Sequence, residues 1–123
     1  MASIVTLETL PLAAYVLGGV VNFSIPSAGG EWAVIGPPLV EAVRELTGAT
    51  TAAELNPRVA RVALAVAYGE TMTNLLQPFF LLIVLPVMGT GMRIQARDVV
   101  GYLFVPFVVL SALVGLLIAF VPV

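Results

Sequence analysis

The stretch NFSIPSAGGEWAVIGPP, residues 22–38, decides how this chain can fold, because it places polar and helix-breaking residues inside an otherwise apolar sequence. It holds one Asn, two Ser, three Pro, three Gly and one Glu. In hydrocarbon, a backbone N–H or C=O group without a partner costs several kcal/mol, so irregular backbone at membrane depth has to be enclosed by protein or water. We therefore interpret residues 22–38 as the polar tip of a re-entrant helical hairpin.

The composition is that of an integral membrane protein. Of the 123 residues, 60% are hydrophobic and 10% are charged, whereas an average soluble domain has about 25% charged residues. No charged residue occurs from Val99 to Val123. At about 1.5 Å per residue, this segment is long enough to cross a hydrocarbon core of ~30 Å. We expect the chain to lie in the inner or plasma membrane, with the lipid bilayer as its surroundings.

Several classes of function are disfavoured by what the chain lacks. It has no Cys and no His, which removes disulfides and most zinc, haem and iron–sulfur sites, so we expect no metal site and no cofactor. The five basic residues are dispersed arginines, a pattern that does not favour nucleic-acid binding. Without a Gly-x-Ser-x-Gly motif or a useful pair of carboxylates, we expect no catalytic residues and no enzyme activity.

The hydropathy pattern divides the chain into five segments. The apolar run before the tip, Leu10–Val21, would be only about 18 Å long as a helix, roughly half a bilayer, which suggests that an upstream portion is missing. The predicted class is an all-α integral membrane protein with a re-entrant hairpin, one broken and one intact transmembrane helix. The expected segments are a hairpin over residues 1–47, an extramembrane loop at 48–57, a broken transmembrane helix over 58–92, a loop at 93–98, and an intact transmembrane helix over 99–123.

The hairpin tip is expected to bind an anion. We place its turn near Ser27–Gly30, because Gly29 and Gly30 permit positive φ and a close approach of the backbone. N–H groups at the start of the following half-helix lack intrahelical partners, and the helix dipole adds about half a positive charge there. With the side chains of Asn22 and Ser27 as further donors, the tip suits a carboxylate.

The broken helix carries a polar stripe within GETMTNLLQP, residues 69–78. Glu70, Thr73, Asn74 and Gln77 are spaced i, i+3, i+4 and i+7, which places them on one side of a helix. Two interpretations are open at this point. The stripe either forms hydrogen bonds between helices, worth about 0.6–2 kcal/mol in membrane bundles, or lines a site.

Acidic residues within membrane segments are costly and usually mark ion or proton pathways. On this ground we expect Glu31 and Glu70 to couple an ion or a proton, although Glu31 could instead stabilise the positive end of the next half-helix. Arg58 and Arg61 follow a loop, so we expect them to anchor the chain at a membrane interface.

Two long motifs follow each other along the chain: Asn22-x-x-x-Pro26-Ser27-x-Gly29-Gly30-x-Trp32-Ala33-x-x-Gly36-Pro37 and Gly69-x-x-x-Thr73-Asn74-x-x-Gln77-Pro78. They resemble the C-terminal part of the short-chain fatty acid transporter family, whose members are associated with acetoacetate and butyrate uptake. That family is similar to the ion-transporter superfamily of anion carriers, which pair re-entrant hairpins with broken helices around a substrate site.

The resemblance runs from about Leu10 to the C-terminus and implies a site for a small monocarboxylate anion. It assigns one group of residues to the hairpin tip, namely Asn22, Ser27, Gly29 and Gly30. It assigns a second group, Thr73, Asn74 and Gln77, to the broken helix that faces the tip.

Two features depart from the family pattern. At the position of Glu31 we expect Gln more often, and a fixed acid there would repel an anionic substrate unless it is protonated or paired with a cation. The chain also matches only about the last quarter to third of a family member, so a missing N-terminal portion or a separate subunit is an expected partner.

Two functional hypotheses follow. The first is the C-terminal part of a secondary transporter for short-chain fatty acids or similar small monocarboxylates, coupled to a proton or cation. The alternative is a non-transporting remnant or a small accessory membrane protein that packs against a larger partner.

Overall fold

The computed structural model describes residues 5–91 and 93–121, and all regular structure within these ranges is helical. The predicted all-α class is confirmed. The expected segments 1–47, 58–92 and 99–123 include residues 1–4, 92 and 122–123, which lie outside the described residues. In chain order the helices are α1 (Leu10–Asn22), α2 (Ala28–Thr47), α3 (Ala52–Thr73), the 3-10 helix η1 (Asn74–Leu76), α4 (Pro78–Met88) and α5 (Ala96–Phe120).

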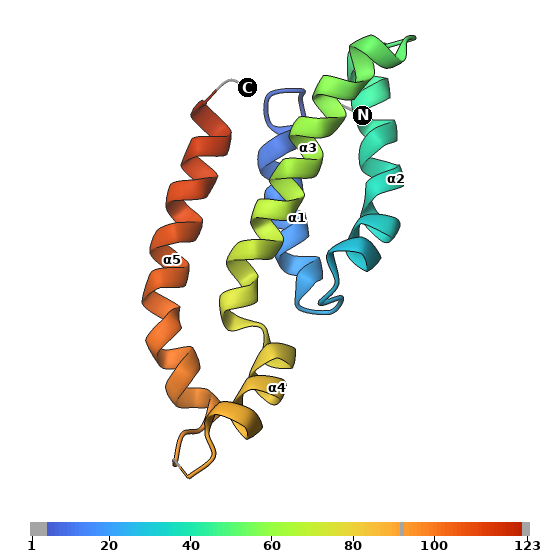
Figure 1. Ribbon diagram of the computed structural model, residues 1–123. Coiled ribbons are helices and arrows are strands. Elements are labelled where there is room, and N and C mark those ends of the chain that lie inside the picture. The colour runs from blue at the N-terminus through green and yellow to red at the C-terminus, as the bar shows by residue number, and fades with distance from the viewer. Residues whose placement is uncertain (1–4, 92, 122–123) are drawn as a thin grey trace.

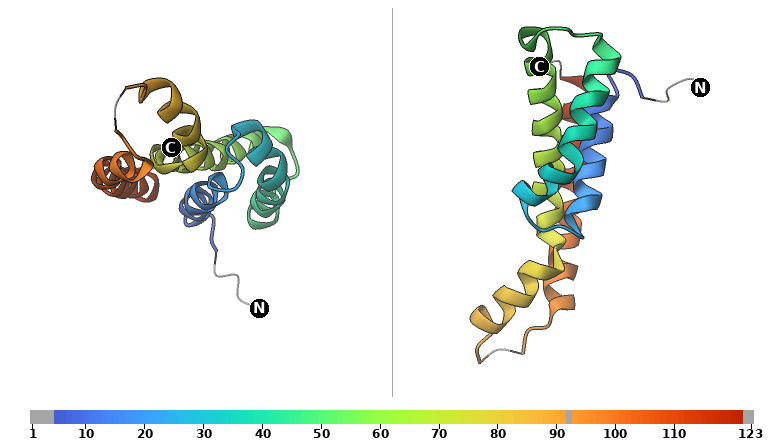
Figure 2. Two further views of the ribbon diagram at one scale, coloured as in Figure 1. Left: turned by 90° about the horizontal axis from the view of Figure 1, so that it is seen from below. Right: turned by 90° about the vertical axis from the view of Figure 1, so that its right-hand side faces the viewer.

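Helices α1 and α2 form a hairpin whose tip lies about half-way along the molecule (Figures 1 and 2). Pro11 stands in the first turn of α1, where the missing N–H costs no intrahelical hydrogen bond. Residues 23–27 connect the two helices, and Ser27 begins α2 as its N-cap, with its Oγ accepting a hydrogen bond from the Gly30 N–H at 3.3 Å. Gly48, with φ of 63°, ends α2 in the left-handed conformation that glycine favours.

The irregular tip is shorter than the sequence suggests. Residues 28–38, which we assigned to the tip, belong to α2. Gly29 and Gly30 do not use the positive φ that glycine permits, since the positive-φ glycines among the described residues are Gly48 and Gly91. The physical reason is the Ser27 cap, which lets the helix begin directly after the connection.

Two of the prolines that the sequence marks as helix-breaking lie inside α2 and do not break it. Pro37 and Pro38 are exposed residues inside the helix. Each removes one hydrogen bond to the carbonyl four residues earlier, at Ala33 and Val34, and these residues are exposed as well. The freed carbonyls therefore do not disturb the packed face of α2.

Helices α3 and α4 form one bent span, with an angle of 46° at the break. After Thr73 the chain makes one short turn of 3-10 helix, Gln77 is extended with ψ of 116°, and Pro78 starts α4. Pro78 accounts for the break, because proline disfavours the helical conformation of the residue before it. The break falls within residues 69–78, the stretch that the sequence marks as interrupted.

Helix boundaries differ from the expected ones at both loops. Helix α3 already starts at Ala52, so the connection that we expected over 48–57 is limited to residues 48–51. Helix α5 starts at Ala96, within the expected loop 93–98, because the Asp98 carboxylate accepts a hydrogen bond from the Gln95 N–H at 2.9 Å and completes a capping box.

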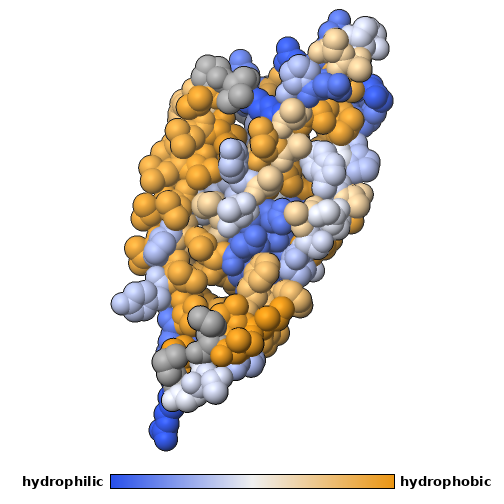
Figure 3. Space-filling view, viewed as in Figure 1, coloured by the Kyte–Doolittle hydropathy of each residue, from blue (hydrophilic) through white to orange (hydrophobic). Residues whose placement is uncertain are grey.

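Helix α5 is long and apolar enough to cross a membrane, and so is the bent α3–α4 pair, judged by length and composition. The Tyr15 hydroxyl donates to the Ser111 carbonyl at 3.0 Å and thereby ties α1 to α5. Apolar surface covers α5 and α4, whereas a hydrophilic patch lies at mid-height, between the hairpin and the lower part of α3 (Figure 3). Polar surface thus occurs at the depth of the hairpin tip.

Helices α1 and α3 pack backbone to backbone through glycines. A Cβ atom on Gly18 would lie 2.7 Å from the Val66 carbonyl oxygen, and a Cβ on Gly69 would overlap the carbonyl oxygen of Tyr15. Small residues at membrane helix interfaces permit this close approach. The contact fixes the register of α1 against α3.

We predict that Gly69→Ala destabilises the chain, because the added methyl group has to push α1 away from α3. Overpacking of this kind costs about 1–3 kcal/mol, so the apparent unfolding temperature of the chain in detergent should fall by several degrees. The control is Gly29→Ala, since a Cβ at Gly29 meets no atom within 4 Å. Equal unfolding temperatures for the two variants would contradict the proposed packing constraint.

Candidate functional site

Polar side chains from the hairpin tip and the helix break meet inside the protein. Asn22, the last residue of α1, is 0% exposed, and Thr73 and Gln77 are 7% and 2% exposed. Asn74 is half-buried beside them. We call these four residues the amide cluster. Buried polar groups of this kind are stable only when they find hydrogen-bond partners.

Asn22 is the centre of the amide cluster. Its side-chain nitrogen lies 2.7 Å from Asn74 Oδ1, 2.9 Å from Thr73 Oγ1 and 3.2 Å from the Glu70 carbonyl oxygen. An amide nitrogen carries two hydrogens, so three acceptors share two donors. The side-chain oxygen of Asn22 is buried and has no hydrogen-bond partner among the described residues.

Gln77 joins the helix break to the hairpin tip. Its Nε2 donates to the Asn22 main-chain carbonyl at 2.8 Å, and its Oε1 accepts from the Phe79 N–H at 2.8 Å, which caps the start of α4. One side chain thus holds both the end of α1 and the beginning of α4. Sequence reasoning placed Gln77 on the polar stripe but missed this double role. The one available signal was its position directly before Pro78, because a residue before proline favours an extended conformation.

The other members of the polar stripe separate into different roles. The Thr73 hydroxyl lies 3.1–3.2 Å from the Gly69 and Glu70 carbonyls, to which it donates, and it accepts from Asn22. Glu70 enters the amide cluster through its main-chain carbonyl, and its side chain is half-buried. The interpretation that the stripe joins helices therefore holds for Thr73, Asn74 and Gln77, and the interpretation that it lines a site stays a prediction.

The remaining tip residues named from the sequence lie apart from the hydrogen bonds of the amide cluster. The Ser27 hydroxyl caps its own helix, Gly29 is exposed and Gly30 is half-buried in the first turn of α2. They occupy the N-terminus of α2, where backbone N–H groups and the helix dipole favour negative charge.

Glu31 is the most unusual side chain of the hairpin. It is 0% exposed and continues the inward face of α2 that Ile35, Leu39 and Val43 form at four-residue intervals. Neither carboxyl oxygen has a hydrogen-bond partner among the described residues. Burial without a partner makes the ionised form of this carboxyl costly.

Two helix N-termini lie at the depth of the amide cluster, because α2 begins at the hairpin tip and α4 begins at the break (Figure 1). Each contributes about half a positive charge. Within residues 5–91 and 93–121, no three acidic side chains gather into a group that could hold a metal ion. The chemistry available at this depth is that of neutral amides, the Thr73 hydroxyl, two helix dipoles and the carboxyl groups of Glu31 and Glu70.

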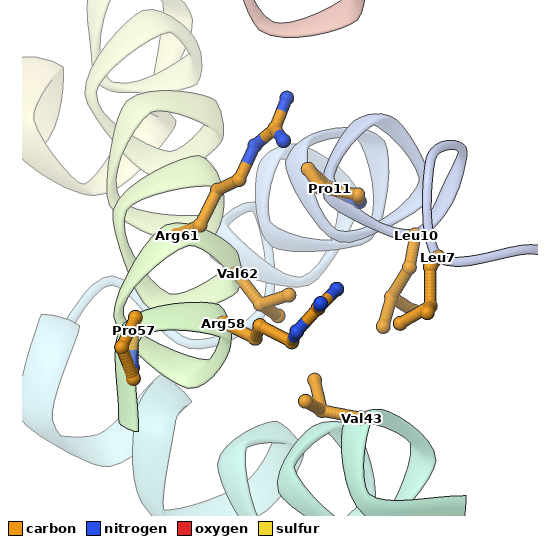
Figure 4. A pocket seen from close by; sticks show the side chains of 8 residues that line it. All are labelled: Leu7, Leu10, Pro11, Val43, Pro57, Arg58, Arg61 and Val62. Atoms are coloured by element: carbon orange, nitrogen blue, oxygen red, sulfur yellow. The ribbon is translucent and has the colours of Figure 1, made fainter. Parts of the chain in front are cut away.

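A separate cavity of about 220 Å³ lies at the other end of α1, between the starts of α1 and α3 (Figure 4). Arg58 reaches into it toward Leu10 and Val43, whereas Arg61 points away. The Arg61 guanidinium donates to the Ile118 and Val121 carbonyls at 3.4 and 3.3 Å, near the end of α5. Arg61 therefore stabilises a helix end remote from the amide cluster.

Comparison with known proteins gives consistent results. A model of the family described as short chain fatty acid transporter matches residues 1–121. Two relatives, from Escherichia coli (strain K12) and Haemophilus influenzae (strain ATCC 51907 / DSM 11121 / KW20 / Rd), are provisionally named short-chain fatty acid transporters. They are 35% and 33% identical over 95 residues, which are 77% of this chain and 19% and 18% of theirs.

The chain thus spans about a fifth of the length of the curated relatives it matches. No solved structure gives a significant match. The family match covers both the hairpin and the bent span that carry the amide cluster, and it places the protein in the membrane. The chain belongs to the short chain fatty acid transporter family.

Proposed function

We propose that this chain forms the C-terminal part of a secondary transporter for short-chain fatty acids or similar small monocarboxylates, with its substrate site at the amide cluster. The observation that carries the proposal is the meeting of the buried amides of Asn22, from α1, and Gln77, from the helix break, beside Thr73 and Asn74. The family match supports the substrate class. The inner or plasma membrane is the proposed location.

The hydrogen bonds of the amide cluster support carboxylate binding. The Asn22 nitrogen is shared among three acceptors, so a carboxylate oxygen can replace one of them without leaving a hydrogen unpaired. The nearby N-termini of α2 and α4 add favourable potential for an anion. Neutral donors hold an anion reversibly, which suits a carrier that has to release its substrate.

The start of α2 is the proposed second wall of the site. The Ser27 hydroxyl is a proposed donor there, and the N–H groups of Ala28 and Gly29 lie in the first turn of the helix, ahead of the Gly30 N–H that Ser27 caps. A Cβ at Gly29 would meet no protein atom within 4 Å. A carboxylate can therefore approach the N–H groups there.

Glu31 and Glu70 are the proposed coupling residues. Glu31 and the side-chain oxygen of Asn22 are buried acceptors at the hairpin tip that lack partners among the described residues. A proton on Glu31, or a hard cation that takes oxygen ligands, would satisfy them. Either one would also relieve the repulsion between Glu31, Glu70 and an anionic substrate. Glu31 differs here from the Gln that the family resemblance led us to expect.

Movement of the hairpin together with the bent span is the proposed basis of alternating access, as in carriers whose discontinuous helices meet at the substrate site. Gln77 is the contact through which the tip and α4 would move together. The lipid bilayer and the remaining part of the transporter, or a separate subunit, are the proposed partners.

We predict that Asn74→Ala lowers uptake of radiolabelled butyrate and acetoacetate into proteoliposomes by at least about tenfold. The side-chain NH2 group of Asn74 is the proposed donor to the carboxylate once its oxygen has left Asn22, and losing a charge-assisted hydrogen bond is worth about 1.5–3 kcal/mol. The transporter is reconstituted in two forms. In the first, this chain is combined with the polypeptide encoded immediately upstream. In the second, this chain replaces the matching residues of the Escherichia coli relative. Asn56→Ala is the matched control, because Asn56 is an exposed residue near the start of α3.

Two outcomes would count against the proposal. Equal uptake by Asn74→Ala and Asn56→Ala would remove the amide cluster from the substrate site. An absence of uptake in both reconstituted forms, with the chain inserted normally, would favour a non-transporting remnant or accessory protein.

A second prediction concerns Glu31. In the same proteoliposomes, Glu31→Gln should make uptake independent of an imposed proton or sodium gradient, because a neutral amide neither gains a proton nor balances a cation. Glu45→Gln changes an exposed carboxylate on the same helix and should keep the gradient dependence of the unchanged protein. Gradient-driven uptake that survives in Glu31→Gln would exclude Glu31 as the coupling residue.

A further inference from the structure

A small apolar pocket adjoins the amide cluster. It has a volume of about 200 Å³ and lies between α1, α3 and α5, which pack against one another. Its walls are carbon atoms almost throughout. The lining residues that matter here are Val16, Gly19 and Val20 of α1, Met72 and Thr73 of α3, and Phe107 of α5.

Gly19 lines the pocket at the close contact between α1 and α3. A Cβ atom on Gly19 would lie 3.2 Å from the Thr73 methyl carbon, so a larger residue would press on the wall that Thr73 forms. Met72 is half-buried, and Val16 and Val20, at 56% and 63% exposed, stand at the rim.

Thr73 is the residue that the pocket and the amide cluster share. Its hydroxyl accepts from the Asn22 side chain at 2.9 Å, whereas its methyl carbon faces Gly19. Polar and apolar binding surfaces therefore lie on two sides of one small side chain. A ligand that spans them needs a polar head directly joined to a short apolar chain.

We propose that this pocket receives the alkyl chain of the carboxylate and sets the chain length that the transporter accepts. The inference rests on the proposed function, because it takes the carboxylate group to lie at the amide cluster. The volume equals roughly six to seven times the ~30 Å³ share of one water molecule. An alkyl chain of a few carbons fits a space of this size.

Phe107→Ala tests the proposal by enlarging the pocket. Uptake of acetate, butyrate, hexanoate and octanoate is measured in the reconstituted transporter, and each is expressed relative to butyrate. Each additional buried methylene strengthens binding about fourfold, so the ratio of hexanoate to butyrate uptake should rise by about fourfold or more. Phe104→Ala is the matched control, since Phe104 lies on the same helix, is 53% exposed and stays outside the pocket.

Val20→Phe changes the pocket in the opposite sense and keeps the test decisive if Phe107→Ala does not fold. The added ring narrows the rim, so the ratio of butyrate to acetate uptake should fall by about fourfold per methylene excluded. Leu17→Phe, on the same helix but outside the pocket, should leave this ratio unchanged. Misfolding lowers all uptake and does not shift the two ratios in opposite directions.

The outcomes separate this inference from the function on which it rests. If the unchanged protein transports butyrate and the pocket variants keep the same chain-length profile as their controls, the pocket does not hold the alkyl chain and the proposed function stands. If the inserted, unchanged protein transports no carboxylate of any length, both are overturned.

Discussion

The close approach of α1 and α3 at their glycines determines where the polar groups of this protein meet. Carbonyl oxygens of Val66 and Tyr15 occupy the space that a Cβ on Gly18 or Gly69 would need, so the two helices have one favourable register. Asn22 stands one turn beyond Gly18, and Thr73 stands one turn beyond Gly69. Because both intervals are four residues, the glycine contact brings these two polar residues together.

Much of the fold could be predicted from the sequence because its signals are local. Pro78 follows a polar interruption and marks the helix break, and the uncharged run after Asp98 is long enough to span. The extent of the tip could not be predicted, since Pro37 and Pro38 look like helix breakers in a sequence. In the structure they lie on the exposed side of α2, where missing hydrogen bonds leave the packed face intact.

The candidate site was predictable in part for a similar reason. Asn22, Thr73, Asn74 and Gln77 are conspicuous as polar residues in apolar segments, and the structure does bring them together. Gly29 and Gly30 were chosen for a conformational freedom that the Ser27 cap makes unnecessary. The bond from Gln77 to Asn22 joins residues 55 positions apart, and the apolar pocket needs three helices, so neither has a local signal.

A contact that joins helices and a site that binds substrate are usually treated as alternatives, but the amide cluster can serve as both. Three acceptors around the Asn22 nitrogen share two hydrogens. Exchanging one protein acceptor for a carboxylate oxygen therefore costs little hydrogen-bond energy. The same exchange loosens the link between Asn22 and the helix break. Gln77 binds the same residue through its main chain and also caps α4. Under the proposed function, a substrate that displaces the Asn74 oxygen from Asn22 therefore removes one link between the hairpin and the helix break and leaves the Gln77 link in place. Substrate binding is then linked to movement through the bonds that maintain the resting arrangement.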